Sequence, residues 1–268
     1  MPHSLNLRGQ LVSLERPLVM GILNLTPDSF YADSRATVAD VRSRVEQMVA
    51  EGVDIIDVGA VSTRPGHDFV SEEEELRRLR EGLPAIVETA AGIPISVDTF
   101  RANVARVAVE EYDVAIINDV SSGADPQMFS LAARLGVPYV LTACQDVHKD
   151  PQPLRSMFVE LAKQINRLRE LGAKDIILDP GIGFGKTREQ NFLVLKHLED
   201  FREFGLPLLV GLSRKSFIYE TLQTTPADSL FGTIALNALA LERGANILRV
   251  HDVLEAKQTV NCQLSTVN

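Results

Sequence analysis

The chain has 268 residues, of which 45% are hydrophobic, an ordinary share for a globular protein with a large core. Its formal net charge of -9 argues against nucleic acid as a partner, because nucleic acid favours basic surfaces. No apolar run approaches the ~20 residues that cross a bilayer, and the first residues lack a signal-peptide pattern, so we expect no membrane association. The two cysteines, Cys144 and Cys262, form no metal-binding spacing, and we expect a reduced, cytoplasmic protein.

Eight short apolar runs, rich in Val and Ile, recur along the chain, and each stops at a polar residue. The stops are Asn24, Asp57, Asp98, Asn118, Thr142, Asp179, Ser213 and Arg249. Continuous apolar runs are typical of strands buried on both faces, and the helical patterns between them predict parallel strands with right-handed crossovers. Eight such units predict an α/β fold, a (β/α)8 TIM barrel. We expect one domain over residues 1–268, with the barrel proper at about 17–266.

The helices are expected between these runs, where apolar residues recur at helical spacing. Their ranges are 38–51, 71–90, 101–111, 126–135, 153–171, 188–204, 226–243 and 253–265. Ser71, followed by three glutamates, is expected to be an N-cap, and a glycine follows five of the helices as C′ glycines do. Residues 1–15 are predicted to form a strand or hairpin that closes the bottom of the barrel.

Because active sites of TIM barrels lie at the C-terminal strand ends, the polar stops predict the site itself. Asp98, Asn118 and Asp179 end the third, fourth and sixth runs, and an amide with carboxylates suits an aminopyrimidine-like ring. The alternative is that each acid only caps the helix that follows it. Three coincident strand ends make this alternative weak.

The ends of the seventh and eighth runs place positive donors at the usual phosphate corner of a TIM barrel. Lys215 follows the seventh run, and Arg249 and His251 end the eighth. A solvated surface cluster is the alternative, and it fits poorly because each residue lies at a strand end.

Three further segments carry candidate chemistry. The side-chain oxygen of Asn24 suits Mg²⁺ bridging substrate phosphates, although for this segment taken alone an Asx-turn before Pro27 is the favoured explanation. Arg64, in a Gly/Pro loop, suits a bidentate grip on an anion or a solvated loop. The glycines of 181–186 allow close backbone approach to a ligand, and Phe184 suits stacking on a planar ring; no Walker pattern fits, which excludes a nucleotide-triphosphate site.

Seven motifs in register between about residue 17 and residue 257 resemble those of the dihydropteroate synthase family. They are GILNLTPDSF (21–30), STRPG (62–66), SVDT (96–99), INDVS (117–121), LDPGIGFG (178–185), GLSRKS (211–216) and RVHDV (249–253). One such motif alone is weak, whereas seven in order are specific.

The resemblance implies the condensation of 6-hydroxymethyl-7,8-dihydropterin diphosphate with p-aminobenzoate, giving 7,8-dihydropteroate and pyrophosphate, with Mg²⁺ as cofactor and a homodimer as the assembly. It implies that Asp98, Asp179 and Lys215 are catalytic. The pterin residues it implies are Asp98, Asn118, Cys144, Asp179, Lys215 and Arg249. For p-aminobenzoate they are Thr63, Arg64, Phe184 and Ser213; for the diphosphate, Asn24, Arg64, Arg249 and His251; for the metal, Asn24.

The chain also departs from the family pattern. Cys144 stands in a Leu-Thr-Ala-Cys-Gln run where the family has Met-His-Met, residues 31–35 lack the usual glycines, and Val61 replaces a common acid. These departures leave open a pterin-binding paralogue with little turnover. A corrinoid methyltransferase-type domain is a second alternative, but Lys215 and the segment 62–64 argue against it, because methyl transfer needs no diphosphate corner.

Overall fold

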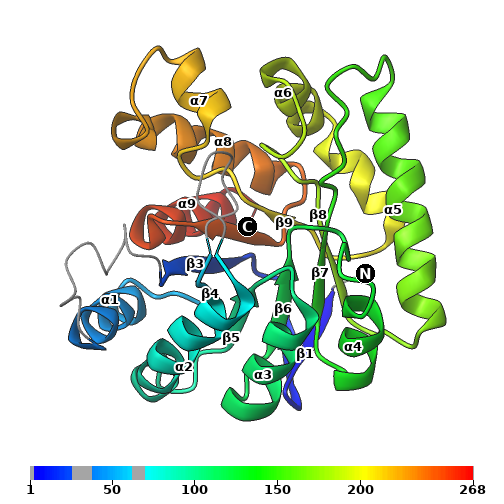
Figure 1. The fold of residues 1–268 in the computed structure, drawn as a ribbon. Coiled ribbons are helices and arrows are strands. Elements are labelled where there is room, and N and C mark those ends of the chain that lie inside the picture. Colours follow the sequence, from blue (N-terminus) through cyan, green and yellow to red (C-terminus); the bar gives the residue numbers. More distant parts are fainter. Residues whose placement is uncertain (1–2, 26–37, 62–69, 268) are drawn as a thin grey trace.

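The computed structural model describes residues 3–25, 38–61 and 70–267, and it confirms the predicted barrel (Figure 1). Eight parallel strands form one sheet in the order β8-β7-β6-β5-β4-β3-β10-β9. A single bridge between Leu178 and Leu208 joins the two outer strands, and Leu178 N–H donates to the carbonyl of Pro207 at 2.8 Å. The barrel is therefore nearly closed.

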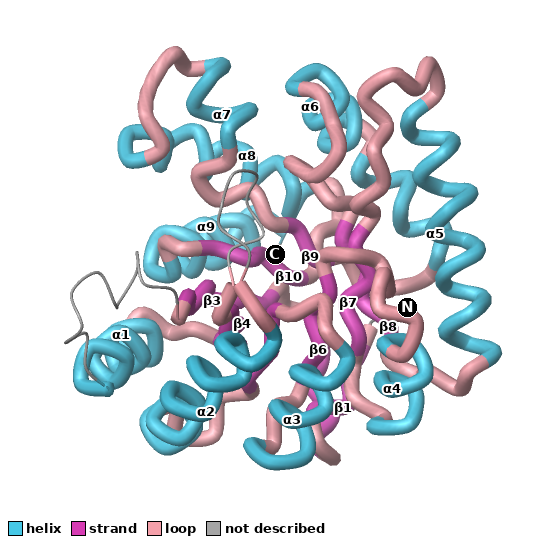
Figure 2. The backbone as a smooth tube through the Cα atoms, viewed as in Figure 1, coloured by secondary structure: helices cyan, strands magenta, loops and turns pink. Residues whose placement is uncertain are grey.

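The strands of the barrel are β3 (Leu18–Asn24), β4 (Ile55–Gly59), β5 (Ile95–Asp98), β6 (Ile116–Asp119), β7 (Tyr139–Thr142), β8 (Ile176–Asp179), β9 (Leu209–Val210) and β10 (Ile247–Val250). The helices that surround them are α1 (Val38–Ala50), α2 (Glu72–Thr89), α3 (Ala102–Tyr112), α4 (Met128–Leu135), α5 (Pro153–Glu170), α6 (Arg188–Lys196), α7 (Ser216–Thr221), α8 (Leu230–Glu242) and α9 (Val253–Val267). The tube view shows these helices arranged around the strands (Figure 2).

Most of the predicted helices are confirmed, and they begin within two residues of the predicted position. This N-terminal end of each helix follows a loop at the mouth of the barrel. Ser71 is the N-cap of α2, and its hydroxyl accepts from Glu74 N–H at 3.2 Å. Two predictions were wrong in part. The helix expected over 188–204 ends at Lys196 and continues as the 3-10 helix η2 (Leu198–Phe204), and the range expected from 226 begins as the 3-10 helix η3 (Ala227–Ser229). The helix α7 was not predicted, because six residues are too few to show a helical period.

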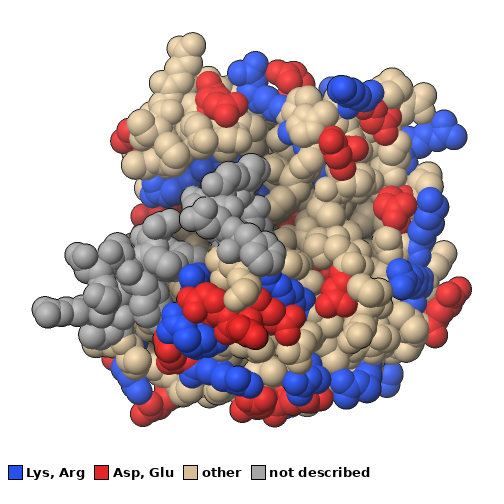
Figure 3. Space-filling view, viewed as in Figure 1, with Lys and Arg blue, Asp and Glu red and all other residues tan. Residues whose placement is uncertain are grey.

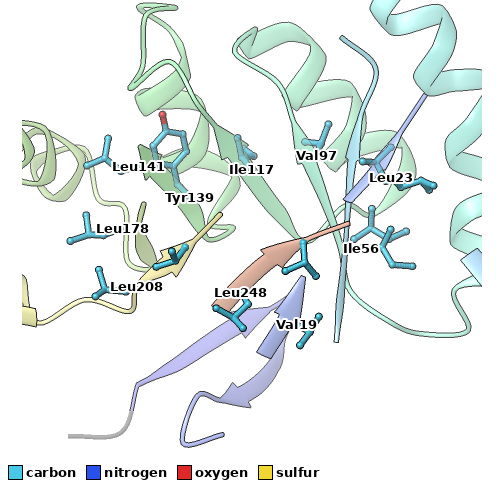
Figure 4. Close-up of a cluster of buried hydrophobic side chains, with 14 of the residues drawn as sticks. Val19, Leu23, Ile56, Val97, Ile117, Tyr139, Leu141, Leu178, Leu208 and Leu248 are labelled. Atoms are coloured by element: carbon cyan, nitrogen blue, oxygen red, sulfur yellow. The ribbon is translucent and has the colours of Figure 1, made fainter. Parts of the chain in front are cut away.

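The strand residues alternate between two separate cores. Residues facing the helices, such as Val19, Ile56 and Ile117, join the larger core that Figure 4 draws. Residues of the opposite parity form the smaller core inside the barrel: Met20, Ile55, Ile116, Val140, Ile177, Leu209 and Ile247. This alternation decides which strand residues can reach the mouth.

The N-terminal hairpin closes the lower end of the barrel, as predicted. The strands β1 (Ser4–Leu7) and β2 (Gln10–Ser13) pair antiparallel. Leu5, Leu7 and Leu14 join the smaller core inside the barrel, so the hairpin seals its base with apolar side chains. Within the described ranges, no helix combines the length and hydropathy that a membrane crossing requires.

Candidate active site

The upper half of the barrel interior is polar, whereas the lower half is apolar. Following the inward parity upward from the smaller core leads to Asp57 on β4, Asn118 on β6, Asp179 on β8 and Arg249 on β10. Asp98 lies level with Asn118 in the register of β5 and β6. Side chains from strands that are not neighbours in the sheet therefore meet above the apolar plug, as the sequence predicts for Asp98, Asn118 and Asp179.

Arg249 is the centre of this cluster. Its Nε donates to Asp57 Oδ2 and its Nη2 to Asp98 Oδ2, each at 2.6 Å. Asn118 Nδ2 donates to the same oxygen of Asp57 at 3.0 Å. Because β10 pairs with β3 and β9, and not with β4 or β5, these bonds cross the barrel and tie its walls together.

Asp57 is a site residue to which sequence reasoning gave no role. In the sequence Asp57 is the polar stop of the second apolar run, but β4 continues two residues further to Gly59. Its side chain is fully buried and bridges Arg249 and Asn118. The period-2 parity of the strand, which places Asp57 on the same face as the apolar Ile55, is the signal that could have found it.

Three oxygen atoms of the cluster are left with hydrogen-bonding capacity. Asp57 Oδ1, Asp98 Oδ1 and Asn118 Oδ1 are buried and accept no hydrogen bond from any residue that the structure describes. Buried acceptors without a donor cost free energy, so such atoms are rare unless a ligand or water satisfies them. All three are acceptors. The mouth is therefore suited to a ligand that presents several N–H donors.

Burial dominates the electrostatics of the two central acids. It raises the pKa of Asp98 to about 7, although the neighbouring Arg249 opposes the shift. Burial also raises the pKa of Asp179, against the attraction of Lys215. The alternative that Asp98 caps a helix was wrong: Arg101 is the N-cap residue of α3, and Asp125 Oδ2 accepts from Ala102 N–H at 2.8 Å.

Lys215 follows β9, whose neighbours in the barrel are β10, which carries Arg249, and β8, which carries Asp179. Its ammonium donates to the carbonyl of Ile182 and lies 4.6 Å from the centroid of the Phe184 ring. A Cβ at position 183 would lie 2.8 Å from Lys215 Cδ, so the glycine at this position leaves room for the lysine side chain. Burial lowers the pKa of Lys215 to about 8, with Asp179 opposing the shift. A cation and a ring therefore border the same glycine loop.

The predicted phosphate corner is partly as expected. His251 lies one residue past β10, and its Nδ1 is 3.1 Å from Ser213 Oγ. Ser213 was predicted at the end of a strand, but β9 ends at Val210, three residues earlier. Arg214, in a positive-φ conformation, binds Asp252 with two nitrogens, at 3.0 and 2.9 Å. The charge of Arg214 is therefore paired with Asp252. Its neighbour Lys215 instead points toward the glycine run 181–185.

Asn24 ends β3 beside Asp98. A Cβ built on Gly59 would lie 3.5 Å from Asn24 Oδ1 and 3.8 Å from Asp98 Oδ2, so both oxygens border the same glycine. Among the described residues no group of three or more His, Cys, Asp or Glu side chains could hold a metal. The donor set fits a hard cation that takes one amide oxygen from the protein and its other ligands from substrate and water.

Thr63 and Arg64, predicted for p-aminobenzoate, lie outside the described residues. The residues on either side of their segment are anchored. Arg78 Nη1 donates to the carbonyl of Ala60 at 2.9 Å, and Arg101 Nη2 donates to the carbonyl of Val70 at 2.6 Å. Both anchors come from charged side chains of the α2–α3 wall, which sequence reasoning did not single out.

A surface cleft of about 830 Å³ opens beside the mouth, between the loops after β6 and β7 and the start of α5. Of the predicted site residues that the structure describes, Cys144 alone lines it. Burial raises the pKa of the Cys144 thiol. The space-filling view shows acidic and basic side chains interleaved around the hollowed face (Figure 3). Cys144 therefore lies in the lining of this cleft, two residues past the end of β7.

Comparison with known proteins identifies the class to which this barrel belongs. Residues 20–251 match the family model of the pterin binding enzymes. Together with the eight-stranded barrel and its polar mouth, this match defines the chain as a pterin-binding TIM-barrel enzyme.

The relatives narrow the class to one activity. The dihydropteroate synthase of Clostridium beijerinckii is 42% identical over 90% of this chain and 91% of its own length. The structure of Xanthomonas albilineans dihydropteroate synthase with 4-aminobenzoic acid is 36% identical, with a TM-score of 0.91 over 100% of this chain and 99% of that chain. The structure of the Thermus thermophilus synthase in complex with 6HMPPP is also 36% identical, with a TM-score of 0.86 over 98% and 99%. The chain belongs to the dihydropteroate synthase family, transferases of folate biosynthesis.

Proposed function

We propose that the mouth of this barrel condenses 6-hydroxymethyl-7,8-dihydropterin diphosphate with p-aminobenzoate, and that the cluster around Arg249 holds the pterin. The observation that carries the proposal is the set of three buried acceptors, on Asp57, Asp98 and Asn118, that find no donor in the part of the chain that the structure describes. The aminopyrimidine edge of a pterin carries N–H donors. Such a ring would satisfy the three acceptors together, which an apolar ligand would not.

The opposite edge of the ring would meet Lys215. A pterin also presents oxygen and nitrogen acceptors, and the Lys215 ammonium is a donor beside Asp179. Arg249 is held in place by two carboxylates, so its planar group is preorganised to stack on the ring. Cys144 offers a small apolar wall on the remaining side.

The second substrate and the diphosphate would lie toward the loops. Phe184 and Ser213, with Thr63 and Arg64, are our candidates for contacts with p-aminobenzoate. Asn24 and His251, with Arg64 and Arg249, are our candidates for the diphosphate. Mg²⁺, held through Asn24 Oδ1, would neutralise charge on the diphosphate. The relatives with 4-aminobenzoic acid and with 6HMPPP support this assignment of ligand classes.

The chemistry follows from these positions. The bond between the pterin methylene carbon and the diphosphate oxygen breaks, and the oxygen keeps the electron pair. The cation that remains is delocalised over the pterin, and the carboxylates of Asp98 and Asp179 stabilise its charge. The arylamine nitrogen then bonds to the methylene carbon and releases a proton to solvent. No covalent enzyme intermediate is required.

The helices α7 and α8 support a homodimer. Phe231 is 83% exposed and Leu222 is 51% exposed, and Leu222 packs beside Gly232 of α8. Large exposed apolar side chains gathered on one face are typical of a protein interface. The sedimentation of Phe231→Asp tests this part of the proposal: we expect a dimer for the wild type and a monomer for the variant, and an unchanged dimer would place the interface elsewhere.

A cytoplasmic location follows from the same proposal. The structure holds Cys144 and Cys262 as free thiols, which suits a reducing compartment. Its test is fractionation of cells that express the protein, with activity in the cytoplasmic fraction as the expected outcome.

Pyrophosphate release tests the activity directly. Purified protein is given the dihydropterin diphosphate, Mg²⁺ and p-aminobenzoate, and each is omitted in turn. We expect release that requires all three, with dihydropteroate formed in equal amount. Saturable binding of the pterin diphosphate without release would instead support the paralogue with little turnover.

A further inference from the structure

Lys186 directly follows the glycine run 181–185, and its ammonium is buried beneath that run. Only 6% of the residue is exposed. Its Nζ donates to the carbonyl of Ala143 at 2.8 Å and to those of Gly181 and Phe184 at 3.0 Å each. An ammonium group has three N–H donors. All three of these donors are therefore used on main-chain carbonyls.

The backbone of the glycine run explains why a donor is needed here. Gly181, Gly183 and Gly185 all have positive φ, at 65°, 89° and 57°. A Cβ on Gly181 would overlap the carbonyl of Ala143, and one on Gly185 would lie 2.5 Å from the carbonyl of Gln145. The run thus packs its main chain directly on the exit of β7. Two main-chain hydrogen bonds already join the segments, from Ala143 N–H to the carbonyl of Asp179 at 2.8 Å and from Val147 N–H to the carbonyl of Gly185 at 2.9 Å. Lys186 adds three donors, one to the exit of β7 and two to the glycine run itself.

Each of these carbonyls lies next to a predicted substrate contact. Ala143 directly precedes Cys144, and the N–H of Gly181 donates to Asp179 Oδ1 at 2.8 Å. Phe184 supplies both a carbonyl to Lys186 and the aromatic ring of the loop. A shift of the ammonium would therefore move three parts of the predicted site at once.

The charge of Lys186 also acts on the site. Burial lowers the pKa of Lys186 to about 8, while Asp179 and Cys144 favour its charged form. In return, its positive charge is among the causes that lower the pKa of Asp179 against the effect of burial. The ammonium thus helps to keep the carboxylate of Asp179 ionised.

We propose that Lys186 is a positioning residue of the pterin site: its ammonium joins the exit of β7 to the loop after β8 and thereby sets the pocket in which the ring lies. It acts through the main chain and through Asp179. The inference rests on the proposed function. It adds to it a residue outside the substrate contacts that the family resemblance implies.

Lys257 provides a matched control. It is another lysine at low exposure, 9%, and its Nζ lies 2.9 and 2.8 Å from the two oxygens of Asp54 at the lower end of the barrel. Lys186→Met and Lys257→Met make the same change at two positions: each removes an ammonium group and keeps an unbranched apolar side chain. Only the first removal lies beside the predicted site.

The test compares the binding and kinetics of these variants with those of the wild type. The Kd of the pterin diphosphate is measured by calorimetry, and KM and kcat by pyrophosphate release. For Lys186→Met we expect the Kd and KM of the pterin diphosphate to rise about tenfold, with a smaller fall in kcat. For Lys257→Met we expect both constants within about twofold of the wild type, although the Tm falls in both variants. Lys186→Gln keeps two N–H donors without the charge, and its KM should lie between those of the wild type and Lys186→Met.

Two results would overturn the inference. One is a Lys186→Met variant whose Kd and KM stay within twofold of the wild type while its Tm falls. The other is an equal rise of KM in Lys257→Met. If Lys186→Met does not fold, Lys186→Gln carries the same comparison, and an unchanged KM there overturns the inference. A wild type that binds the pterin diphosphate without releasing pyrophosphate would contradict the proposed function alone, since the comparison of Kd values would still stand.

Discussion

The acidic side chains at the two ends of the barrel differ in how completely they are hydrogen-bonded. At the lower end, Asp54 accepts from Lys257 with both oxygens and from Val19 N–H at 2.7 Å, so its acceptor capacity is used. At the mouth, Asp57 and Asp98 share Arg249, yet each keeps one buried oxygen that accepts from none of the described residues. Both arrangements place an acid against a cation. Only at the mouth do carboxylate oxygens remain that accept no hydrogen bond from the described residues.

The difference separates a structural ion pair from a prepared binding site. Completed hydrogen bonds stabilise the folded chain, whereas unsatisfied buried acceptors destabilise it until a ligand arrives. Burial raises the pKa of Asp98 to about 7, and the neighbouring Arg249 opposes this shift. Residues of the mouth should therefore control activity with little benefit to stability, and residues of the lower end should do the reverse.

The largest effect is expected from Lys215→Ala and Asp98→Asn. Each should lower kcat/KM by about 100-fold or more, because each removes a charge that acts on the reacting pterin. For Asp98 the sign of the stability effect is also defined. Burial raises its pKa in the folded chain above the usual value for an aspartate, so the contribution of Asp98 to stability is greatest below pH 4 and falls as the pH rises toward 7.

Asp98→Asn removes the titrating group, so its Tm at pH 8 should equal or exceed that of the wild type. Steady-state kinetics and thermal unfolding of both variants provide the check. A variant with wild-type kcat/KM would show that the pterin site is wrongly assigned.

At the lower end, Asp54→Asn should have the reverse effect. The variant weakens the pair with Lys257 in a partly exposed position, where the carboxylate side chain is 24% exposed. We expect the free energy of unfolding to fall by about 2 kcal/mol. The value of kcat/KM should stay within about twofold of the wild type. Denaturant unfolding and kinetics on one preparation measure both quantities, and a large loss of kcat/KM would remove the distinction between the two ends.

The sequence could predict those features of the mouth that follow from the alternation of inward and outward side chains along each strand. The barrel, and the convergence of Asp98, Asn118 and Asp179, follow from apolar runs with polar ends. Asp57 was not predicted as a site residue because it precedes the end of its strand by two residues. Its position two residues after Ile55, on the same face of the strand, was visible in the sequence.

Other features depend on contacts between segments that are distant in the chain. The bonds of Lys186 reach from residue 186 to residue 143, and no local pattern indicates them. The short helix α7 and the early end of β9 at Val210 are likewise set by packing. The roles of the site residues, and the assignment of the whole chain to one domain, stay predictions.

The dependence of activity on pH should reflect the burial of Asp98 and Lys215 at the mouth of the barrel. The pKa of Asp98 near 7 leaves this acid protonated below that pH, so kcat/KM should fall about tenfold for each pH unit well below 7. The pKa of Lys215, lowered to about 8 by burial, predicts a fall above pH 8. We therefore expect a bell-shaped profile with its maximum between these values. Kinetics from pH 5.5 to 9.5, with the substrates titrated separately, give the answer, and a flat profile through pH 7 would show that Asp98 does not need its charge.

The smallest effect is expected at Cys144, which lines the cleft of about 830 Å³. Cys144→Met restores the larger apolar side chain that the family resemblance implies. It should lower the Kd of the pterin diphosphate by roughly threefold, because more apolar surface leaves water when the ring is bound. Cys262→Met is the matched control, since Cys262 is exposed on α9. Calorimetry on both variants measures the difference. If Cys144→Met leaves the Kd unchanged, the thiol lies too far from the ring to form a wall of the pocket, and the polar cluster alone holds the pterin.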